Sequence, residues 1–377
     1  MSATRVTLVM NTVAPYRIPV FESLASREEI DLTVVFGSEG LGHRHWDVDL
    51  SATSFSYRVL RSAGMHVADR DWSPRISPAL VPVVRRTQPN AIVVGGYASP
   101  DDWALWAYAR SCRLPLTLWF GSTAYSERAS AQGVARLKRR FINGVDSFVT
   151  YGSLAAEHLR ARGVPASRIV VGCNVGDTPF FSSRTEATRA DRQPGDPVRF
   201  VFVGQLIERK GVSEALQAFE SASLDRAELH VVGTGPLRSM VDAAAARGVP
   251  IVAHGHLDSQ QVAEIYARSD VMLIPSRREV FSIVTSEALA SGLFTITSPW
   301  NGAAPDLITD GVTGLVVDPA DGDALREAVQ RADASIRTGA TSAEAIARSV
   351  ADRTPAAYAG AIAKAIGIAQ RARSGDS

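Results

Sequence analysis

Two glutamates bracket the start of an expected helix, with seven residues between Glu279 and Glu287. The apolar run 271–274, VMLI, predicts a strand that leads into this segment, and Gly292 would close the helix as a C-cap. If the helix begins near Ser282, Glu287 lies about 7 Å further along its axis, and Glu279 precedes it in the loop. The amides at the positive end of the helix dipole would then lie between the two carboxylates. They belong to Val280, Phe281, Ser282 and Ile283.

Such a junction predicts a site for an anion with hydroxyl groups on either side of it. Phosphate is the usual occupant of a helix N-terminus, whereas the natural partners of carboxylates are hydroxyl groups. A molecule with polyol, phosphate and polyol in series would satisfy all three parts, and a nucleotide sugar fits this description. The alternative is a surface helix on which Glu279 favours the dipole and Glu287 faces solvent.

A second segment suited to chemistry is FVGQLIERKGV, 202–212, between an expected strand and a helix. Gly204 permits a tight turn, and Gly211 permits a close approach as the next helix starts. Arg209 and Lys210 place cations at the end of a strand, where they could stabilise the charge that develops on a departing diphosphate. The alternative is a solvated basic turn. We favour the first interpretation because this turn and the turn before the glutamate helix open onto the same edge of one parallel sheet.

The segment AHGHL, 253–257, ends another expected strand. Gly255 would expose backbone amide and carbonyl groups to a flat ring, with His254 and His256 on either side of it. The alternative is that these histidines are packed or hydrogen-bonded residues without a direct function.

The first half of the chain offers candidates for the side of a site that faces an acceptor. NTVAPYR, 11–17, follows the first expected strand but contains no glycine, so it is not a phosphate loop. In GGYASPDDW, 95–103, Asp101 or Asp102 could bind acceptor hydroxyls, but both aspartates would also suit a helix start behind Ser99. The candidates on this side are Asn11, Tyr16, Arg17, Asp101 and Asp102.

Composition limits the classes of protein to which the chain can belong. It has 377 residues, 46% of them hydrophobic, and a net charge of +1, so no global field recruits nucleic acid or a membrane. Its two cysteines lack metal-ligand spacing, and no run of 18 apolar residues exists. We expect a protein of the reducing cytoplasm with no metal. The run ARLKRRF, 135–141, is typical of a solvated face, and weak contact with a membrane surface is the alternative.

Short apolar runs alternate with amphipathic stretches along the whole chain, which indicates parallel sheets built from βαβ units. Expected strands are 5–10, 31–36, 54–60, 91–96, 114–120, 146–152, 168–172, 198–204, 228–233, 250–255, 271–275, 293–298 and 313–318. Expected helices include 19–26, 78–87, 100–113, 131–143, 154–162, 321–337, 341–351 and 355–371. We therefore predict an α/β protein of two doubly wound, Rossmann-like domains that face each other, with the ligand in the cleft between them.

Together these motifs resemble the retaining nucleotide-sugar glycosyltransferases of family 4, also called glycosyl transferases group 1, whose two-domain architecture is named GT-B. The similarity is strongest over residues 198–330, where VGQLIERKG, VVGTGPLR, EVFSIVTSEALASG and NGAAPDLITDGVTGLVVDP are similar to family motifs. GCNVGDTPFF, 172–181, resembles the family's hinge. Two departures are that Gln205 stands where the family has arginine and that NTVAPYR replaces its glycine-rich N-terminal loop.

The resemblance implies the transfer of a hexose-like sugar from a nucleotide-diphosphate donor to an acceptor hydroxyl, with retained configuration and no metal or other cofactor. Lys210 would bind the donor diphosphate, Glu279 the donor sugar and Glu287 the ribose, while the backbone of 255–257 would face the base. The remaining donor-side candidates are Gly204, Gln205, Arg209, Gly255, His256, Leu257 and the four amide-bearing residues Val280, Phe281, Ser282 and Ile283.

The resemblance also implies a division of labour between domains. Residues 1–176 would form the acceptor-side domain, 177–197 a linker and 198–352 the nucleotide-sugar-binding domain. Residues 353–377 would form a helix that packs back on the first domain. The expected partners are the donor and a small-molecule, glycan or glycolipid acceptor, without nucleic acid. Alternatives are a catalytically silent nucleotide-sugar-binding protein and a GT-B epimerase.

Overall fold

The computed structural model describes residues 3–38, 49–60, 63–64, 75–126, 132–189 and 195–375. The chain divides into two compact units, each of which is described by itself. Unit 1 comprises Met1–Asn174 and Pro355–Ser377, and unit 2 comprises Val175–Thr354. None of the helices in the described parts of the chain is long and apolar enough to cross a membrane.

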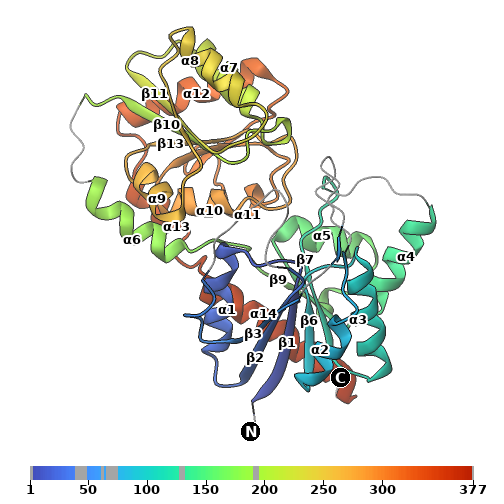
Figure 1. The fold of residues 1–377 in the computed structure, drawn as a ribbon. Helices are drawn as coiled ribbons and strands as arrows, with labels where there is room; N and C mark the ends of the chain where they lie inside the picture. The colour runs from blue at the N-terminus through green and yellow to red at the C-terminus, as the bar shows by residue number, and fades with distance from the viewer. Residues whose placement is uncertain are drawn as a thin grey trace. The chain divides into compact units, whose positions relative to one another are not determined.

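Unit 1 contains a seven-stranded parallel sheet with the order β3-β2-β1-β6-β7-β8-β9 (Figure 1). Its strands are β1 (Thr4–Met10), β2 (Ile30–Phe36), β3 (Ser56–Val59), β6 (Ala91–Val94), β7 (Leu116–Phe120), β8 (Ser147–Thr150) and β9 (Ile169–Val171). A short antiparallel pair adds β4 (Ala63–Gly64) and β5 (Arg75–Ile76). The central strands β6, β7 and β8 are buried throughout, as is typical of parallel strands covered on both faces.

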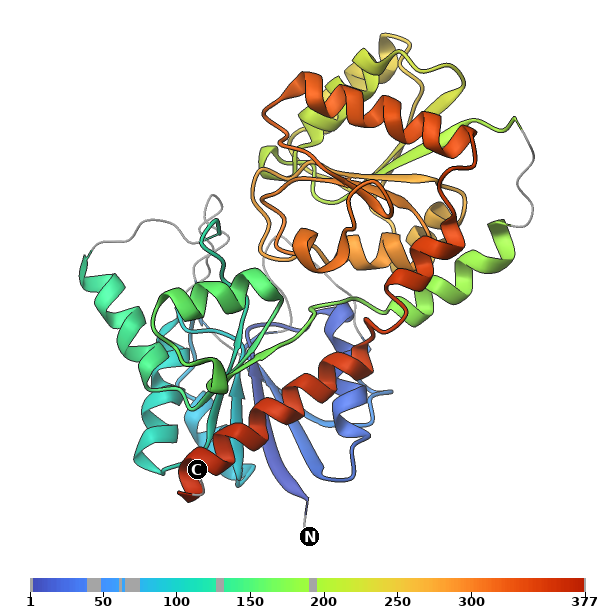
Figure 2. The same cartoon turned by 180° about the vertical axis from the view of Figure 1, so that it is seen from behind.

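Helices cover both faces of this sheet and enclose two apolar cores (Figures 1 and 2). One face carries α1 (Ile18–Ala25) and α14 (Pro355–Ser374). The other carries α2 (Leu80–Arg86), α3 (Pro100–Ser111), α4 (Gln132–Asn143) and α5 (Ser153–Ala161). The last helix, α14, thus returns to unit 1, where the Trp119 indole N–H donates a hydrogen bond to the buried Tyr358 hydroxyl.

Unit 2 contains a six-stranded parallel sheet with the order β12-β11-β10-β13-β14-β15. Its strands are β10 (Val198–Val203), β11 (Ala227–Val232), β12 (Ile251–Gly255), β13 (Val271–Ile274), β14 (Phe294–Thr297) and β15 (Gly314–Val316). Its helices are α6 (Thr178–Arg189), α7 (Val212–Ala222), α8 (Arg238–Ala246), α9 (Ser259–Ala267), α10 (Ile283–Ala290), α11 (Ala304–Leu307), α12 (Gly322–Arg337) and α13 (Ala343–Ser349).

Each sheet has one point where the strand order reverses. In unit 2 the chain runs from β10 outward to β12 and then returns to β13 on the other side of β10. In unit 1 the reversal lies between β1 and β6. Ligands of doubly wound sheets bind at such switch points, outside the carboxyl ends of the strands. The turns 204–211 and 275–282 follow β10 and β13, so both lie at the switch point of unit 2.

The predicted linker 177–197 is corrected by the structure. Thr178–Arg189 forms α6, which packs against α9 and α10, and Phe181 contacts Tyr266 with ring centroids 5.6 Å apart. Among the α6 residues whose side chains are described, the buried positions 178, 181 and 185 have helical spacing, but two of them are the threonines Thr178 and Thr185. The sequence therefore shows no apolar period there.

Candidate functional site

The loop from β13 to α10 carries the first predicted glutamate and presents backbone amides at the start of the helix. Ser282 is the N-cap residue with extended backbone, and α10 begins at Ile283. The Ser282 amide donates to Asn301 Oδ1 at 3.2 Å, so it is already bonded within the fold. Among the described residues, no acceptor is bonded to the amides of Val280 and Phe281. The predicted set of four anion-binding amides is therefore corrected for Ser282, whose N–H is engaged by Asn301.

Asn301 fixes this loop and is a residue that the sequence interpretation missed. It is fully buried, and Oδ1 also accepts a hydrogen bond from the Ala303 amide at 3.1 Å. Its Nδ2 donates to the hydroxyls of Thr285 and Thr297. The next residue, Gly302, leaves no room for a side chain, since a Cβ there would lie 1.9 Å from the Val280 carbonyl oxygen. The signal was the NG pair at 301–302, which begins four positions after β14 ends at Thr297, because Asn-Gly is typical of turns.

Lys210 and Glu279 meet at the switch point although 69 residues separate them. Lys210 Nζ donates to Glu279 Oε2, and Arg209 Nη1 lies 3.6 Å from the same oxygen. The three side chains are only 12% to 21% exposed, so water screens the charges weakly. The structure thus brings together two cations and one carboxylate beside the unbonded amides of the β13–α10 loop.

The backbone of the β10–α7 turn explains why this cluster forms. Glu208–Lys210 make one turn of 3₁₀ helix, and Gly211 follows with φ of 74°. A Cβ at Gly211 would lie 1.9 Å from the Pro275 carbonyl oxygen, so the turn can approach the end of β13 only with glycine at this position. The Arg277 amide donates to the Arg209 carbonyl at 3.0 Å and ties the two turns together.

Glu287 lies on α10, one turn after its start, in a carboxylate-rich environment. Burial, together with the neighbouring Asp177 carboxylate, raises the pKa of Glu287 from 4.5 to about 7. Burial likewise raises the pKa of Asp177. The Tyr266 hydroxyl is buried without a hydrogen-bond partner among the described residues, and burial followed by the Glu287 charge raises its pKa. Among the described residues no Lys or Arg forms an ion pair with Glu287, and with a pKa of about 7 its carboxyl group can accept hydrogen bonds from hydroxyl groups and, when protonated, donate one.

The other donor-side candidates lie along the same edge of the sheet. Gly204 and Gln205 follow β10. Gly255 ends β12, which is two strands away from β10, or roughly 10 Å at the usual strand spacing. His256 is exposed and Leu257 is half-buried after that strand. His254, in contrast, is bonded to His230 at 3.0 Å between ring nitrogens, in line with the packed alternative.

The acceptor-side candidates lie at the switch point of unit 1, but two of them serve the fold. Arg17 is only 5% exposed, and its guanidinium donates to Asn174 Oδ1 and the Tyr151 hydroxyl. Asp102 is buried and forms a reciprocal capping box with Ser99 at the start of α3. Both side chains are thus engaged in hydrogen bonds within unit 1, and their contact with an acceptor stays a prediction.

The side chains of the remaining acceptor-side candidates are more exposed than those of Arg17 and Asp102. Asp101 accepts from the Ser77 amide at 2.7 Å and is partly exposed. Asn11 is exposed, and Tyr16 is half-buried in the turn between β1 and α1.

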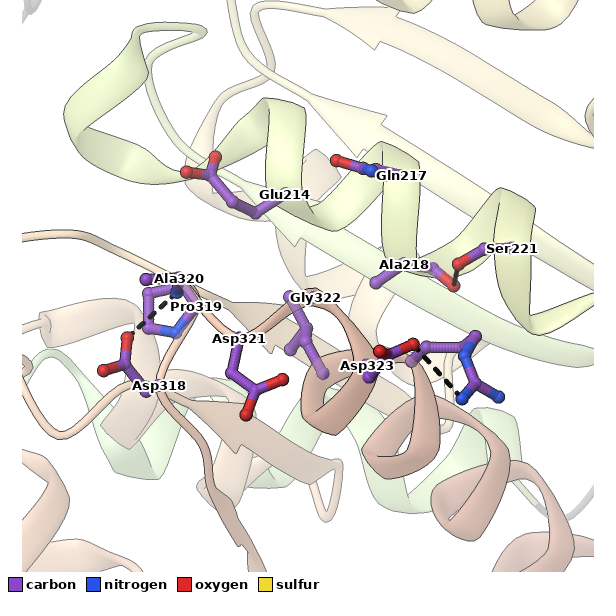
Figure 3. Close-up of a pocket in the computed structure, with 12 residues that line it drawn as sticks. Glu214, Gln217, Ala218, Ser221, Asp318, Pro319, Ala320, Asp321, Gly322 and Asp323 are labelled. Carbon is purple, nitrogen blue, oxygen red and sulfur yellow. Dashed lines mark hydrogen bonds and ion pairs between the residues drawn. The ribbon is translucent and has the colours of Figure 1, made fainter.

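A separate hollow of about 740 Å³ lies between α7 and the start of α12 (Figure 3). Its charged lining is mainly acidic, from Glu214, Asp318, Asp321 and Asp323, and also includes Arg326, which forms an ion pair with Asp323. The predicted donor residues are not part of its lining, and its charge does not suit a diphosphate. We therefore assign the candidate site to the switch point and not to this hollow.

Comparisons with known proteins give matches that include this part of the chain. The sequence profile described as "Glycosyl transferases group 1" matches residues 183–334, which include Lys210, Glu279 and Glu287. The chain is 31% identical over 308 residues to the GDP-mannose-dependent alpha-mannosyltransferase of Mycobacterium tuberculosis, a match that covers 81% of this chain and 65% of the relative. It is 27% identical over 180 residues to sulfoquinovosyl transferase SQD2 of Arabidopsis thaliana, which covers 46% of this chain and 32% of the relative. The aligned parts span between 32% and 65% of the length of the first four curated relatives.

Solved structures share the architecture of the whole chain. Anabaena HepE in complex with UDP has a TM-score of 0.73 at 15% identity, covering 97% of this chain and 99% of HepE. The lipopolysaccharide outer core galactosyltransferase WaaB in its apo form has a TM-score of 0.69 at 16% identity, covering 96% of this chain and 99% of WaaB. These similarities show that the chain has the α/β GT-B fold with two Rossmann-like domains.

Proposed function

We propose that the protein is a glycosyltransferase that moves a sugar from a nucleotide-diphosphate sugar to an acceptor hydroxyl. The match of residues 183–334 to the glycosyl transferases group 1 profile supports the proposal. The observation that carries the proposal is the cluster of Lys210, Arg209 and Glu279 beside the unbonded amides of Val280 and Phe281. Cations and amides suit a diphosphate, and the carboxylate suits the sugar next to it.

The cluster suggests how the donor is bound. In the unliganded chain Glu279 neutralises the two cations. The incoming diphosphate takes over Lys210 and Arg209, which releases Glu279 to accept hydrogen bonds from the hydroxyls of the donor sugar. This exchange keeps the buried cations paired before and after binding, which avoids the cost of an uncompensated buried charge. Glu287, on the next turn of α10, accepts from the ribose hydroxyls.

The same groups stabilise the transition state. The bond between the anomeric carbon and the diphosphate oxygen breaks, and negative charge grows on the departing diphosphate beside Lys210, Arg209 and the two amides. The acceptor oxygen attacks the anomeric carbon from the side that the diphosphate leaves, so the configuration is retained, and its proton passes to a diphosphate oxygen. We propose that this step uses no resident metal or other cofactor. The nucleotide-diphosphate sugar is consumed as a substrate.

The names of two similar proteins indicate which nucleotide sugars should be tested first as donors. One curated relative is GDP-mannose-dependent, and one structural neighbour holds UDP. A thermal-shift panel of GDP-mannose, UDP-sugars, ADP-sugars and TDP-sugars, followed by a transfer assay with mixed acceptors, tests the proposal. A ligand at 100 times its Kd should add about 2.7 kcal/mol to the free energy of unfolding. Failure of every nucleotide sugar to stabilise the chain would refute the proposal, and binding without transfer or hydrolysis would favour a silent binding protein.

We also propose that the protein is located in the cytoplasm. The sequence contains only two cysteines, Cys112 and Cys173, and no disulfide occurs among the described residues, which supports a cytoplasmic location.

A further inference from the structure

Helix α4 of unit 1 is buried at one end and exposed at the other. Near its carboxyl end, Phe141 is fully buried and packs edge-on against Trp103 with ring centroids 5.2 Å apart. From Gln132 to Lys138 almost every side chain is exposed, and both views show this amino-terminal half projecting from the neighbouring helices of unit 1 (Figures 1 and 2).

The exposed half of α4 continues the apolar stripe that anchors the buried half. Val134, Leu137 and Phe141 follow the i, i+3, i+7 pattern and therefore lie on one side of the helix. Phe141 enters the core, whereas Leu137 is 54% exposed and Val134 is 46% exposed. Apolar side chains on the same helix stripe as a core residue are usually buried. Nothing in the described part of the chain covers Val134 and Leu137, however.

Basic residues surround this exposed apolar pair. The helix carries Arg136, Lys138, Arg139 and Arg140, and residues 132–143 contain no Asp or Glu. At 100° per residue, Lys138 flanks Val134 on one side and Arg140 flanks Leu137 on the other. The helix therefore presents a narrow apolar stripe between two cationic borders, which is the pattern of a helix that lies in the surface of an anionic bilayer.

We propose that the exposed half of α4 is a peripheral docking surface for an anionic lipid bilayer. Two apolar side chains are too little for a stable protein interface, and two copies of this helix would repel each other through their like charges. An anionic bilayer suits both parts of this surface, because acyl chains receive Val134 and Leu137 while anionic head groups neutralise Lys138 and Arg140 at the two borders. The proposal does not depend on the proposed transfer reaction, and its test does not use activity.

The test is co-sedimentation of the full chain with vesicles of equimolar phosphatidylglycerol and phosphatidylcholine, compared with vesicles of phosphatidylcholine alone. Wild type should bind the anionic vesicles and lose this binding at high salt. The double variant Val134→Asp/Leu137→Asp should weaken the partition coefficient at least about tenfold. Arg140→Gln, which neutralises one of the two cationic borders, should also weaken it about fivefold, since a basic residue near an anionic surface contributes about that factor.

Matched controls separate the role of α4 from general changes in polarity and charge. Val312 in unit 2 is 59% exposed, so Val312→Asp removes a similar side chain elsewhere. Arg85→Gln/Arg86→Gln neutralises two exposed arginines of α2. Both controls should bind like wild type, and all variants should keep the wild-type Tm within a few degrees because the substituted side chains are exposed.

Three results would overturn the proposal. One is equal binding of wild type to both kinds of vesicle, or binding to neither. Another is a loss of binding in the controls as large as that in the α4 variants. The third is a concentration-dependent dimer in sedimentation velocity that Val134→Asp/Leu137→Asp abolishes without any vesicle binding, since the stripe would then be an interface between copies of the chain.

Discussion

Replacing Glu287 by glutamine should stabilise the unliganded protein at neutral pH and at the same time weaken donor binding. Glutamine has nearly the shape of a protonated glutamate but cannot ionise. The substitution therefore removes the cost of an ionised carboxylate that is buried beside Asp177, while it also removes the anionic acceptor proposed for the ribose.

The magnitude follows from the pKa of Glu287. In the folded chain this pKa is raised from 4.5 to about 7, first by burial and second by Asp177. At about 1.4 kcal/mol for each pH unit between these two values, ionisation in the folded chain costs roughly 3 kcal/mol. Below the lower value both folded and unfolded chains hold the proton, and the cost is absent. As pH rises towards the upper value, the unfolded chain loses its proton first, so wild-type stability falls.

The assay is urea unfolding of wild type and Glu287→Gln at several pH values. The stability of the variant relative to wild type should rise between about pH 5 and pH 7 and level off above that range, at no more than roughly 3 kcal/mol. The matched control is Glu264→Gln, which changes an exposed glutamate on helix α9 and should alter the free energy of unfolding by no more than about 0.5 kcal/mol. A pH-independent difference for Glu287→Gln, or a variant less stable than wild type at neutral pH, would refute the reasoning, because Glu287 would then be ionised and stabilised by a partner.

The remaining predictions concern the groups around this glutamate and the loop before it. Asp177→Asn keeps the oxygen that accepts from the Phe180 amide but removes the charge next to Glu287. Glu287 should then ionise at a lower pH, so the rise of donor affinity with pH should move to a lower pH in calorimetric titrations. Lys210→Ala should lower kcat by roughly two orders of magnitude, about 3 kcal/mol, and Lys210→Arg should recover part of this loss; near-normal turnover in the alanine variant would remove Lys210 from the mechanism. Gly302→Ala should displace the loop and weaken donor affinity at least about tenfold, whereas Gly322→Ala, with open space around the added methyl group, should leave the donor Kd unchanged.

Much of the fold follows from the sequence because the parallel sheets are buried on both faces. Continuous apolar runs such as 91–94 and 271–274 have no other stable environment, and the expected strands agree with the observed ones to within two or three residues at each end. The switch point of unit 2, which contains Lys210 and Glu279, follows from the alternation of strands and helices. Helix α6 was missed because its sequence carries too few apolar residues to show a period.

The parts of the site that the sequence did not predict depend on contacts between distant segments. Nothing near Glu287 in sequence indicates that Asp177, 110 positions earlier, shares its environment and raises its pKa. Nothing in the sequence near Ser282 indicates either that Asn301 accepts a hydrogen bond from the Ser282 N–H, which we expected to bind an anion. Arg17 was placed on the acceptor side because it follows β1, but its guanidinium contacts Trp119 of β7, Tyr151 directly after β8 and Asn174 after β9. Such pairings become visible only when the chain is folded.

The most direct test of the central claim is a crystal structure of the protein with a non-transferable nucleotide-diphosphate sugar. We expect the diphosphate to contact Lys210 and the amides of Val280 and Phe281, with the bond between Lys210 and Glu279 broken and Glu279 turned to the sugar hydroxyls. A diphosphate bound elsewhere, with the bond between Lys210 and Glu279 intact, would contradict the account.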